Sequence, residues 1–269
     1  MMISLTLALA LTAFEPQGSS PYEVDYVFDT TLTLGSFAAL TAMHQLAGPS
    51  LPSNYICSQA TPDVPCDRGD LNKLDRGTVG DHDKTWDKIG SLSLYAVIGG
   101  TAVGVMIDNG LSPRDGKLRG ILADTLVIAE ATSLATFTTH ILRYAVRRPR
   151  PTQYVGGADI AMSDQERHLS FPSGHVTSTS ALATGFATTF WLRHPDSPWR
   201  WAVAGGSVVV STISGYGRVA GGRHFPSDQI AGQIIGTAFG LLVPLAHRAD
   251  LAVNVSTGDT KMITIAWSL

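Results

Sequence analysis

The chain has 269 residues, of which 44% are hydrophobic and only 15% are charged. Ordinary soluble domains carry roughly 25% charged residues, so unusually apolar helices or contact with a membrane are expected. The mean hydropathy of +0.14 is modest for a protein that crosses a bilayer many times. The net charge of −3 gives no general attraction to nucleic acid, and no nucleic-acid partner is expected.

Residues 1–14 form an apolar run that ends in small residues, like the hydrophobic region of a secretory signal. The run is shorter than the roughly 20 residues that span a bilayer, which favours a signal over a first buried helix. Cys57 and Cys66 are the two cysteines, and they flank a polar loop that contains prolines. Such a pair suits a disulfide in an oxidising compartment, with two unrelated thiols as the alternative. Both features predict export to the cell envelope, in a periplasmic or extracytoplasmic location.

Five or six apolar segments follow, each rich in alanine, leucine, glycine and threonine. Their lengths favour helices over strands. In the tail over 251–267, apolar and polar residues alternate on both sides of Thr257-Gly258-Asp259, a pattern that resembles a small β-hairpin. The expected fold is an all-α bundle of about five or six core helices with a short C-terminal hairpin. The apolar segments lie at about 30–47, 89–107, 118–142, 176–192, 201–213 and 229–246.

Two of these segments, 89–107 and 229–246, are long and apolar enough to span a bilayer. The segment over 118–142 carries Asp124, Glu130 and His140, which are costly in lipid. A membrane bundle and a soluble exported bundle therefore both stay open.

The stretch 62–87 is hydrophilic and rich in aspartate. Asp81-His82-Asp83 can be read as a metal motif, and Asp67, Asp70 and Asp75 as a calcium loop. The spacing of these residues does not match an EF-hand. A solvated loop is favoured, and no metal site is predicted.

Three clusters of basic residues and histidines lie where an apolar segment meets a loop. The first closes the third segment with four arginines and two prolines, from Arg143 to Pro151. Prolines end the helix, and arginine forks bind phosphate oxygens in pairs. The plainer alternative is that the arginines cap the negative end of the helix or mark a membrane edge.

The second cluster runs from Ser170 to His175 and precedes the fourth segment. Ser173 is placed to cap that helix, and Gly174 lets the backbone approach a ligand closely. The N–H groups of the first helical turn form an anion site, and His175 can deliver a proton to a leaving oxygen. An ordinary helix start with an incidental histidine is the alternative. His168 is near enough to line the pocket mouth, although a polar loop position is favoured.

The third cluster joins the fifth and sixth segments and contains Arg218, His224 and Asp228. His224 and Asp228 are one helical turn apart, so the carboxylate can hold one ring nitrogen and leave the other free to attack. The alternative is a helix start at which Asp228 only favours the dipole. In an antiparallel bundle the three clusters share one face, which favours a common site.

The clusters resemble the three-part signature of the type 2 phosphatidic-acid phosphatase (PAP2) and vanadium haloperoxidase superfamily. Its first motif is lysine, six residues and Arg-Pro; its second is Pro-Ser-Gly-His; its third is Ser-Arg, five residues, His, three residues and Asp. The chain departs at two positions, because Arg143 replaces the lysine and Gly217 replaces the serine. The matching residues are Arg143 and Arg150-Pro151, Pro172 to His175, and Gly217-Arg218, His224 and Asp228.

The resemblance implies a PAP2-like catalytic core over 118–247. It does not place the N-terminal third, and we expect N-terminal helices with the polar loop at 15–117 and a tail at 248–269. It implies that His224 attacks phosphorus to form a phosphohistidine, that Asp228 orients His224, and that His175 protonates the leaving group. No metal or other cofactor is implied, except vanadate in the haloperoxidase alternative. The implied phosphate-binding residues are Arg143, Arg150, Ser173, Gly174 and Arg218.

The expected function is therefore a metal-independent phosphatase for phosphate monoesters or pyrophosphates, with lipid-linked substrates favoured. A soluble exported acid phosphatase of broad specificity is one alternative, and a vanadate-dependent haloperoxidase is another. A protein with a vestigial pocket is less favoured, because His175, His224 and Asp228 are all present.

Overall fold

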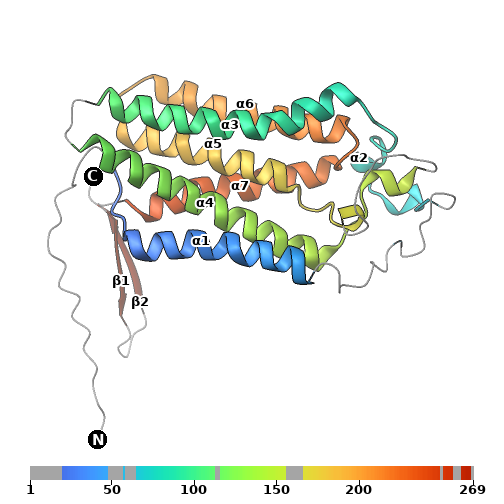
Figure 1. Ribbon diagram of the computed structural model, residues 1–269, viewed down its shortest axis with the longest axis horizontal. Helices are drawn as coiled ribbons and strands as arrows, with labels where there is room; N and C mark the ends of the chain where they lie inside the picture. Colours follow the sequence, from blue (N-terminus) through green and yellow to red (C-terminus); the bar gives the residue numbers. More distant parts are fainter. Residues whose placement is uncertain are drawn as a thin grey trace, which may run out of the picture.

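The computed structural model describes residues 20–47, 57, 65–112, 116–155 and 166–248, together with the backbone of 251–256 and 262–267. The signal predicted at 1–14 lies outside the described residues. Within the described residues, six long helices form a bundle (Figure 1), which confirms the expected all-α fold. These helices are α1 (Tyr26–Ala42), α3 (Lys84–Gly110), α4 (Lys117–Val146), α5 (Gly174–Arg193), α6 (Trp199–Ala220) and α7 (Pro226–Ala246).

Short elements connect the long helices. A π-helical turn, η1 (Met43–Ala47), extends α1, and the short helix α2 (Lys73–Arg76) precedes α3. The remaining turns are 3₁₀ helices, namely η3 (Arg68–Asp70), η4 (Pro151–Tyr154) and η5 (Glu166–His168). The tail forms the predicted antiparallel hairpin from β1 (Leu251–Ser256) and β2 (Met262–Trp267).

Local sequence explains where several helices begin and end. The Asp25 carboxylate caps α1 by accepting hydrogen bonds from the amides of Val27 and Phe28, and Asp83 caps α3 in the same way. Helix α4 ends at Val146, the next residue Arg147 has a left-handed φ of 47°, and prolines follow it. The chain therefore turns back toward the bundle just after the first arginine cluster.

Helix α6 ends at Ala220, several residues beyond the segment predicted from apolar residues at 201–213. The added turns contain Gly215 and Gly217, which give no apolar signal but allow close helix packing. A Cβ at Gly217 would lie 2.7 Å from the Gly90 backbone of α3. The extra turns carry Arg218 into the bundle, where α3 faces it.

Helix α5 is the centre of the bundle and contacts α3, α4, α6 and α7 (Figure 1). Its buried residues are mostly alanine, glycine, serine and threonine. Helix α7 packs against it through Gly232, Gly236 and Gly240, and a Cβ at Gly236 would lie 2.3 Å from the Thr177 carbonyl oxygen. Small residues therefore let the two backbones approach, as at helix interfaces in membranes.

Large apolar side chains lie on the outside of the bundle. Exposed examples include Leu92 and Tyr95 on α3, Val208 on α6, and Ile234 and Leu242 on α7. The segments Lys84–Gly110, Lys117–Tyr154 and Pro226–Ala246 are long and apolar enough to cross a membrane. A small, polar interior with an apolar exterior is the reverse of the pattern in soluble proteins.

The segment before α3 differs from the solvated loop that the sequence favours. Cys57 and Cys66 form the predicted disulfide. Cys66 and Leu71 are buried against Tyr154 and Phe225, beside the third motif. Asp75 is fully buried, because it pairs with Arg148 instead of facing water. Cys66, Leu71 and Asp75 therefore pack beside the motif residues and depart from the expected solvated loop. Most of the other described residues of 62–87 are exposed, as expected.

Candidate active site

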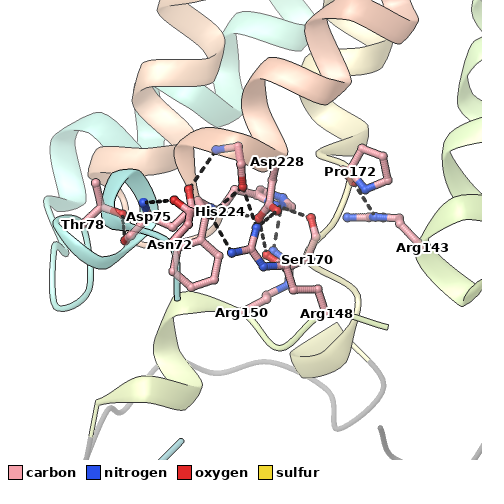
Figure 2. A network of polar contacts seen from close by, with 12 residues as sticks. Asn72, Asp75, Thr78, Arg143, Arg148, Arg150, Ser170, Pro172, His224 and Asp228 are labelled. Carbon is pink, nitrogen blue, oxygen red and sulfur yellow. Dashed lines mark hydrogen bonds and ion pairs between the residues drawn. The ribbon is translucent and has the colours of Figure 1, made fainter. Parts of the chain in front are cut away.

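The three clusters meet at one end of the bundle, as the sequence predicts. The end of α4, the loop before α5 and the junction of α6 and α7 supply the side chains that converge in Figure 2. His224 and Asp228 are almost fully enclosed, with 1% and 0% of the residue exposed, and Arg150 and Arg218 are also buried. Groups far apart in the sequence thus form one enclosed, cationic site.

The His224 ring is held at both nitrogens. Nδ1 lies 2.8 Å from the Ser170 carbonyl oxygen, and Nε2 lies 3.3 Å from Nη1 of Arg150. A carbonyl oxygen only accepts and a guanidinium only donates, so Nδ1 carries the proton and Nε2 carries the lone pair. Burial, together with the charges of Arg150, Arg143 and Arg218, holds the pKa of His224 well below its usual value. A neutral imidazole therefore directs its lone pair toward the arginines.

Asp228 does not form a short hydrogen bond with that ring, since its Oδ2 lies 3.6 Å from His224 Nδ1. Oδ2 accepts hydrogen bonds from the Ser170 hydroxyl at 2.5 Å and from the Phe225 amide at 2.9 Å. Oδ1 accepts one from Arg148 at 2.8 Å. Asp228 thus ties together the loops on either side of His224.

Arg148 links Asp228 to a residue that the motifs do not include (Figure 2). Its Nη2 donates to Asp75 Oδ2 at 2.7 Å, and its guanidinium lies 4.3 Å from the Phe225 ring centre. Asp75 also accepts hydrogen bonds from the amide and hydroxyl of Ser227. Burial raises the pKa of Asp75, but the hydrogen bonds from Ser227 and Arg148 outweigh it and leave this pKa below its usual value. Asp75 therefore stays ionised and holds Arg148 in place.

Arg150 and Arg143 come from the first motif and are fixed through backbone carbonyls. Arg150 donates from Nε to the Glu166 carbonyl at 2.7 Å and from Nη1 to the Arg223 carbonyl at 2.9 Å. Arg143 donates from Nε to the Pro172 carbonyl at 3.1 Å. A Cβ at Gly174 would lie 3.4 Å from Arg143 Nη1, so the glycine leaves this guanidinium close to the start of α5.

Arg218 is oriented by α3, a helix outside the motifs. Its Nη1 donates to Asp87 at 3.2 Å and to the Ser91 hydroxyl at 2.8 Å. Asp87 also forms an ion pair with Arg223, in which Nη2 lies 2.8 Å from Oδ2. The Nε of Arg218 is buried and has no hydrogen-bond partner in the part of the chain that the structure describes. No motif in the sequence points to Asp87, because only the α3–α6 crossing brings it to the arginines.

Ser173 stands at the N-cap of α5, but its side chain makes no capping hydrogen bond, which corrects that expectation. The backbone instead fixes this residue, since its amide donates to the Asp228 carbonyl and its carbonyl accepts from Thr177. The hydroxyl is buried and unpartnered among the described residues. It is thus a free hydrogen-bond donor beside the first amides of α5.

His175 occupies the first turn of α5 and is half-buried. Burial, followed by the charges of Arg218, Arg143 and Arg150, lowers its pKa to about 4. The same three arginines therefore lower the pKa of both His175 and His224. A bound anion would oppose those charges and favour the protonated ring.

Gly217 replaces the serine of the third motif for a packing reason. A Cβ there would lie 2.7 Å from the Cα and amide nitrogen of Gly90 and 2.8 Å from the Trp86 carbonyl oxygen. The close approach of α3 and α6 therefore excludes a serine at this position. The same crossing brings Asp87 to Arg218.

The fold and site define an α-helical bundle in which His175, His224 and several arginines gather at one end. The sequence profile described as PAP2 superfamily matches residues 124–251. This region is therefore similar to the PAP2 superfamily, which confirms the resemblance found in the motifs. The match extends from within α4, through all of the motif residues from Arg143 to Asp228, to the start of the hairpin.

Curated relatives share part of their length with this chain. A lipid A 1-phosphatase of Rhizobium etli is 32% identical over 111 residues, which cover 40% of this chain and 44% of that protein. An undecaprenyl-diphosphatase of Sulfolobus acidocaldarius is 30% identical over 113 residues, or 42% of this chain and 49% of that protein. The matched region therefore covers less than half of the length of each of these relatives.

A solved structure with a related arrangement is the first transmembrane PAP2 type phosphatidylglycerolphosphate phosphatase from Bacillus subtilis. It is 17% identical to this chain, with a TM-score of 0.47, and the match covers 80% of this chain and 93% of that one.

Proposed function

We propose that this protein is a metal-independent phosphatase that hydrolyses lipid-linked phosphate monoesters or pyrophosphates through a phosphohistidine at His224. The observation that carries the proposal is the pair of contacts on that ring. The Ser170 carbonyl holds the proton on Nδ1, and Nε2 directs its lone pair toward Arg150 in a buried cationic site. A neutral imidazole with a fixed tautomer is the form that a nucleophilic histidine requires.

In the first step Nε2 of His224 attacks phosphorus, and the bond from phosphorus to the leaving oxygen breaks. His175 gives its proton to that oxygen. The dianionic phosphate offsets the arginine charges that lower the pKa of His175, so the ring holds a proton when substrate is bound. In the second step water attacks the phosphohistidine, the N–P bond breaks, and His175 accepts the proton.

Donors for the phosphate oxygens surround this position. Arg143, Arg150 and Arg218 supply fixed positive charge, and the unpartnered Ser173 hydroxyl and the Gly174 amide supply further donors. In this proposal the arginines stabilise the negative charge that develops in the transition state. Asp228 and Asp75 act as positioning residues through Ser170 and Arg148.

The exterior of the bundle supports a lipid substrate and a membrane-embedded protein. Three helical segments are long and apolar enough to cross a membrane, and many outward side chains of α3, α6 and α7 are large and apolar. The names of two relatives, a lipid A 1-phosphatase and an undecaprenyl-diphosphatase, also support a lipid-linked phosphate. The Cys57–Cys66 disulfide supports an extracytoplasmic location for the site end of the bundle.

Phosphate release by the purified protein in detergent tests the proposal. The substrates compared are phosphatidate, an isoprenyl pyrophosphate, lipid A and a water-soluble monoester. We expect release from at least one lipid and a loss of several orders of magnitude in His224→Ala. The control is His194→Gln, which alters a histidine paired with Asp108 at the other end of the bundle.

A rapid acid-free quench with ³²P-labelled substrate tests the intermediate. We expect label on the protein that is stable to base and labile to acid, and absent from His224→Ala. Unchanged turnover in His224→Ala, or halide oxidation with added vanadate and no phosphate release, would contradict the proposal.

A further inference from the structure

A second cluster of ionisable residues lies away from the candidate active site. Asp29 is in the first turn of α1, Glu130 is in α4, and His247 directly follows α7. His247 Nε2 lies 3.5 Å from Asp29 Oδ2 and 3.5 Å from Glu130 Oε2. The three ligand atoms all lie within 4.8 Å of one another. Two carboxylate oxygens and one imidazole nitrogen therefore face a common point.

Direct hydrogen bonds do not account for this arrangement. The distances of 3.5 Å exceed those of normal N–H···O bonds. Asp29 and Glu130 are each only 4% exposed, and their oxygens Oδ2 and Oε2 have no hydrogen-bond partner among the described residues. Buried carboxylate oxygens without a partner are strongly unfavourable, most of all in a helix that is apolar enough to span a membrane. A cation between them would remove the penalty.

A hydrogen bond at the other ring nitrogen, Nδ1, orients the His247 ring. Nδ1 lies 3.0 Å from the Val243 carbonyl oxygen, so Nδ1 carries a proton and donates it there. Nε2 is the nitrogen that faces the two carboxylates, and it is the one available to bind a metal ion. Metal-binding histidines are held in this way, with the second N–H on a carbonyl or carboxylate.

We propose that Asp29, Glu130 and His247 bind a zinc ion. Zinc bonds to histidine nitrogen and carboxylate oxygen are about 2.0–2.2 Å, so neighbouring ligand atoms of a tetrahedral site are roughly 3.3–3.5 Å apart. The spacings of 3.5 Å from His247 Nε2 to Asp29 Oδ2 and to Glu130 Oε2 meet that requirement. Mixed imidazole and carboxylate ligands suit zinc better than magnesium or calcium, which prefer oxygen alone. Water completes the coordination.

Zinc at this position would link α1 and the end of α7 to the middle of α4; Figure 1 shows where these helices lie. Glu130 is roughly 20 Å along α4 from Arg143, at about 1.5 Å per residue. The ion is therefore remote from His224 and acts on stability. The proposal does not depend on the phosphatase chemistry, which stays metal-independent.

The metal content of the purified wild-type protein is the first test. After zinc dialysis and removal of free metal, we expect about one zinc per chain by mass spectrometry. X-ray absorption should show one imidazole and otherwise oxygen ligands. Stripping the metal should lower Tm, and added zinc should restore it, while kcat of the folded protein stays unchanged. Wild-type protein without bound zinc, and with a Tm that does not respond to zinc, would overturn the proposal.

Substitutions of the proposed ligands test where the ion binds. Asp29→Asn and Glu130→Gln keep the shape of the side chains and should each abolish stoichiometric zinc and the zinc-dependent Tm shift. The matched control is His140→Asn, because His140 also directs Nδ1 to the carbonyl four residues earlier, that of Thr136 at 2.9 Å, but is outside the cluster. Zinc lost equally from the control, or retained in both carboxylate variants, would overturn the assignment. If a variant does not fold, the wild-type metal content and absorption spectrum still decide the outcome.

Discussion

The His224 ring nitrogen Nδ1 lies 2.8 Å from the carbonyl oxygen of Ser170. The backbone before α5, and not a carboxylate, therefore sets the tautomer of the proposed nucleophile. Asp228 acts one step away, through the Ser170 hydroxyl and Arg148. Because of this arrangement, substitutions at Ser170 and at Asp228 should lower activity by different amounts.

Ser170→Ala removes the hydroxyl but keeps the carbonyl that holds His224. We expect kcat/KM to fall only about ten-fold, as for the loss of about 1.5 kcal/mol with one charged hydrogen bond. Asp228→Ala should cost far more, because it leaves Arg148, Ser170 and the Phe225 amide without their shared acceptor. Steady-state kinetics with each variant at matched fold content measures the difference. Equal losses in the two variants would argue that the carboxylate acts through no partner other than Ser170.

Asp75→Asn tests the positioning role of the segment before α3. The change removes the charge that holds Arg148 and weakens the bonds to Ser227, so kcat and Tm should both fall. The loss of a hydrogen bond to a charged group corresponds to about 1.5–3 kcal/mol. Asp70→Asn is the matched control, since Asp70 is exposed in the same segment. A fall in Tm with unchanged kcat would show that Asp75 is structural only.

Acid should destabilise the ligand-free protein before its carboxylates titrate. The pKa of His175 is lowered to about 4 and that of His224 lies well below its usual value, so the unfolded chain binds more protons between about pH 6.5 and pH 4. Stability is therefore fully present above about pH 6.5 and declines as pH falls through that window. Thermal unfolding in detergent from pH 7 to pH 4.5 measures the slope.

Two comparisons assign that slope to the site. His175→Asn should flatten the slope, because one of the two imidazoles is gone. Added orthovanadate or phosphate should also reduce it, because an anion among the arginines favours protonated His175. A slope that neither change affects would contradict the assignment.

Gly217→Ser restores the serine of the family motif but should destabilise this chain. Its Cβ would overlap the backbone of Gly90 and Trp86, and overpacking of this kind costs about 1–3 kcal/mol. Gly206→Ser is the control on the same helix, because a Cβ there has nothing within 4 Å. Tm measured for both variants checks the prediction, and a Gly217→Ser protein as stable as wild type would contradict it.

The sequence by itself determined the helices and the motif residues of the site. Apolar segments long enough for helices predict α1, α3, α4, α5 and α7 to within a few residues, because helix formation depends on neighbours along the chain. The spacing of charged residues identifies Arg143, Arg150, His175, Arg218, His224 and Asp228. The three motifs carry that information because each is contiguous or nearly so.

Only the tertiary structure decided which groups orient these residues. Asp75 and Asp87 resemble surface aspartates in the sequence, yet each is paired with an arginine from a distant motif. The last turns of α6 have a weak apolar signal, and glycines there let α3 approach closely. Likewise, the Ser170 carbonyl carries no side-chain signature. Long-range pairing and backbone contacts depend on how helices cross, and neither composition nor periodicity encodes that crossing.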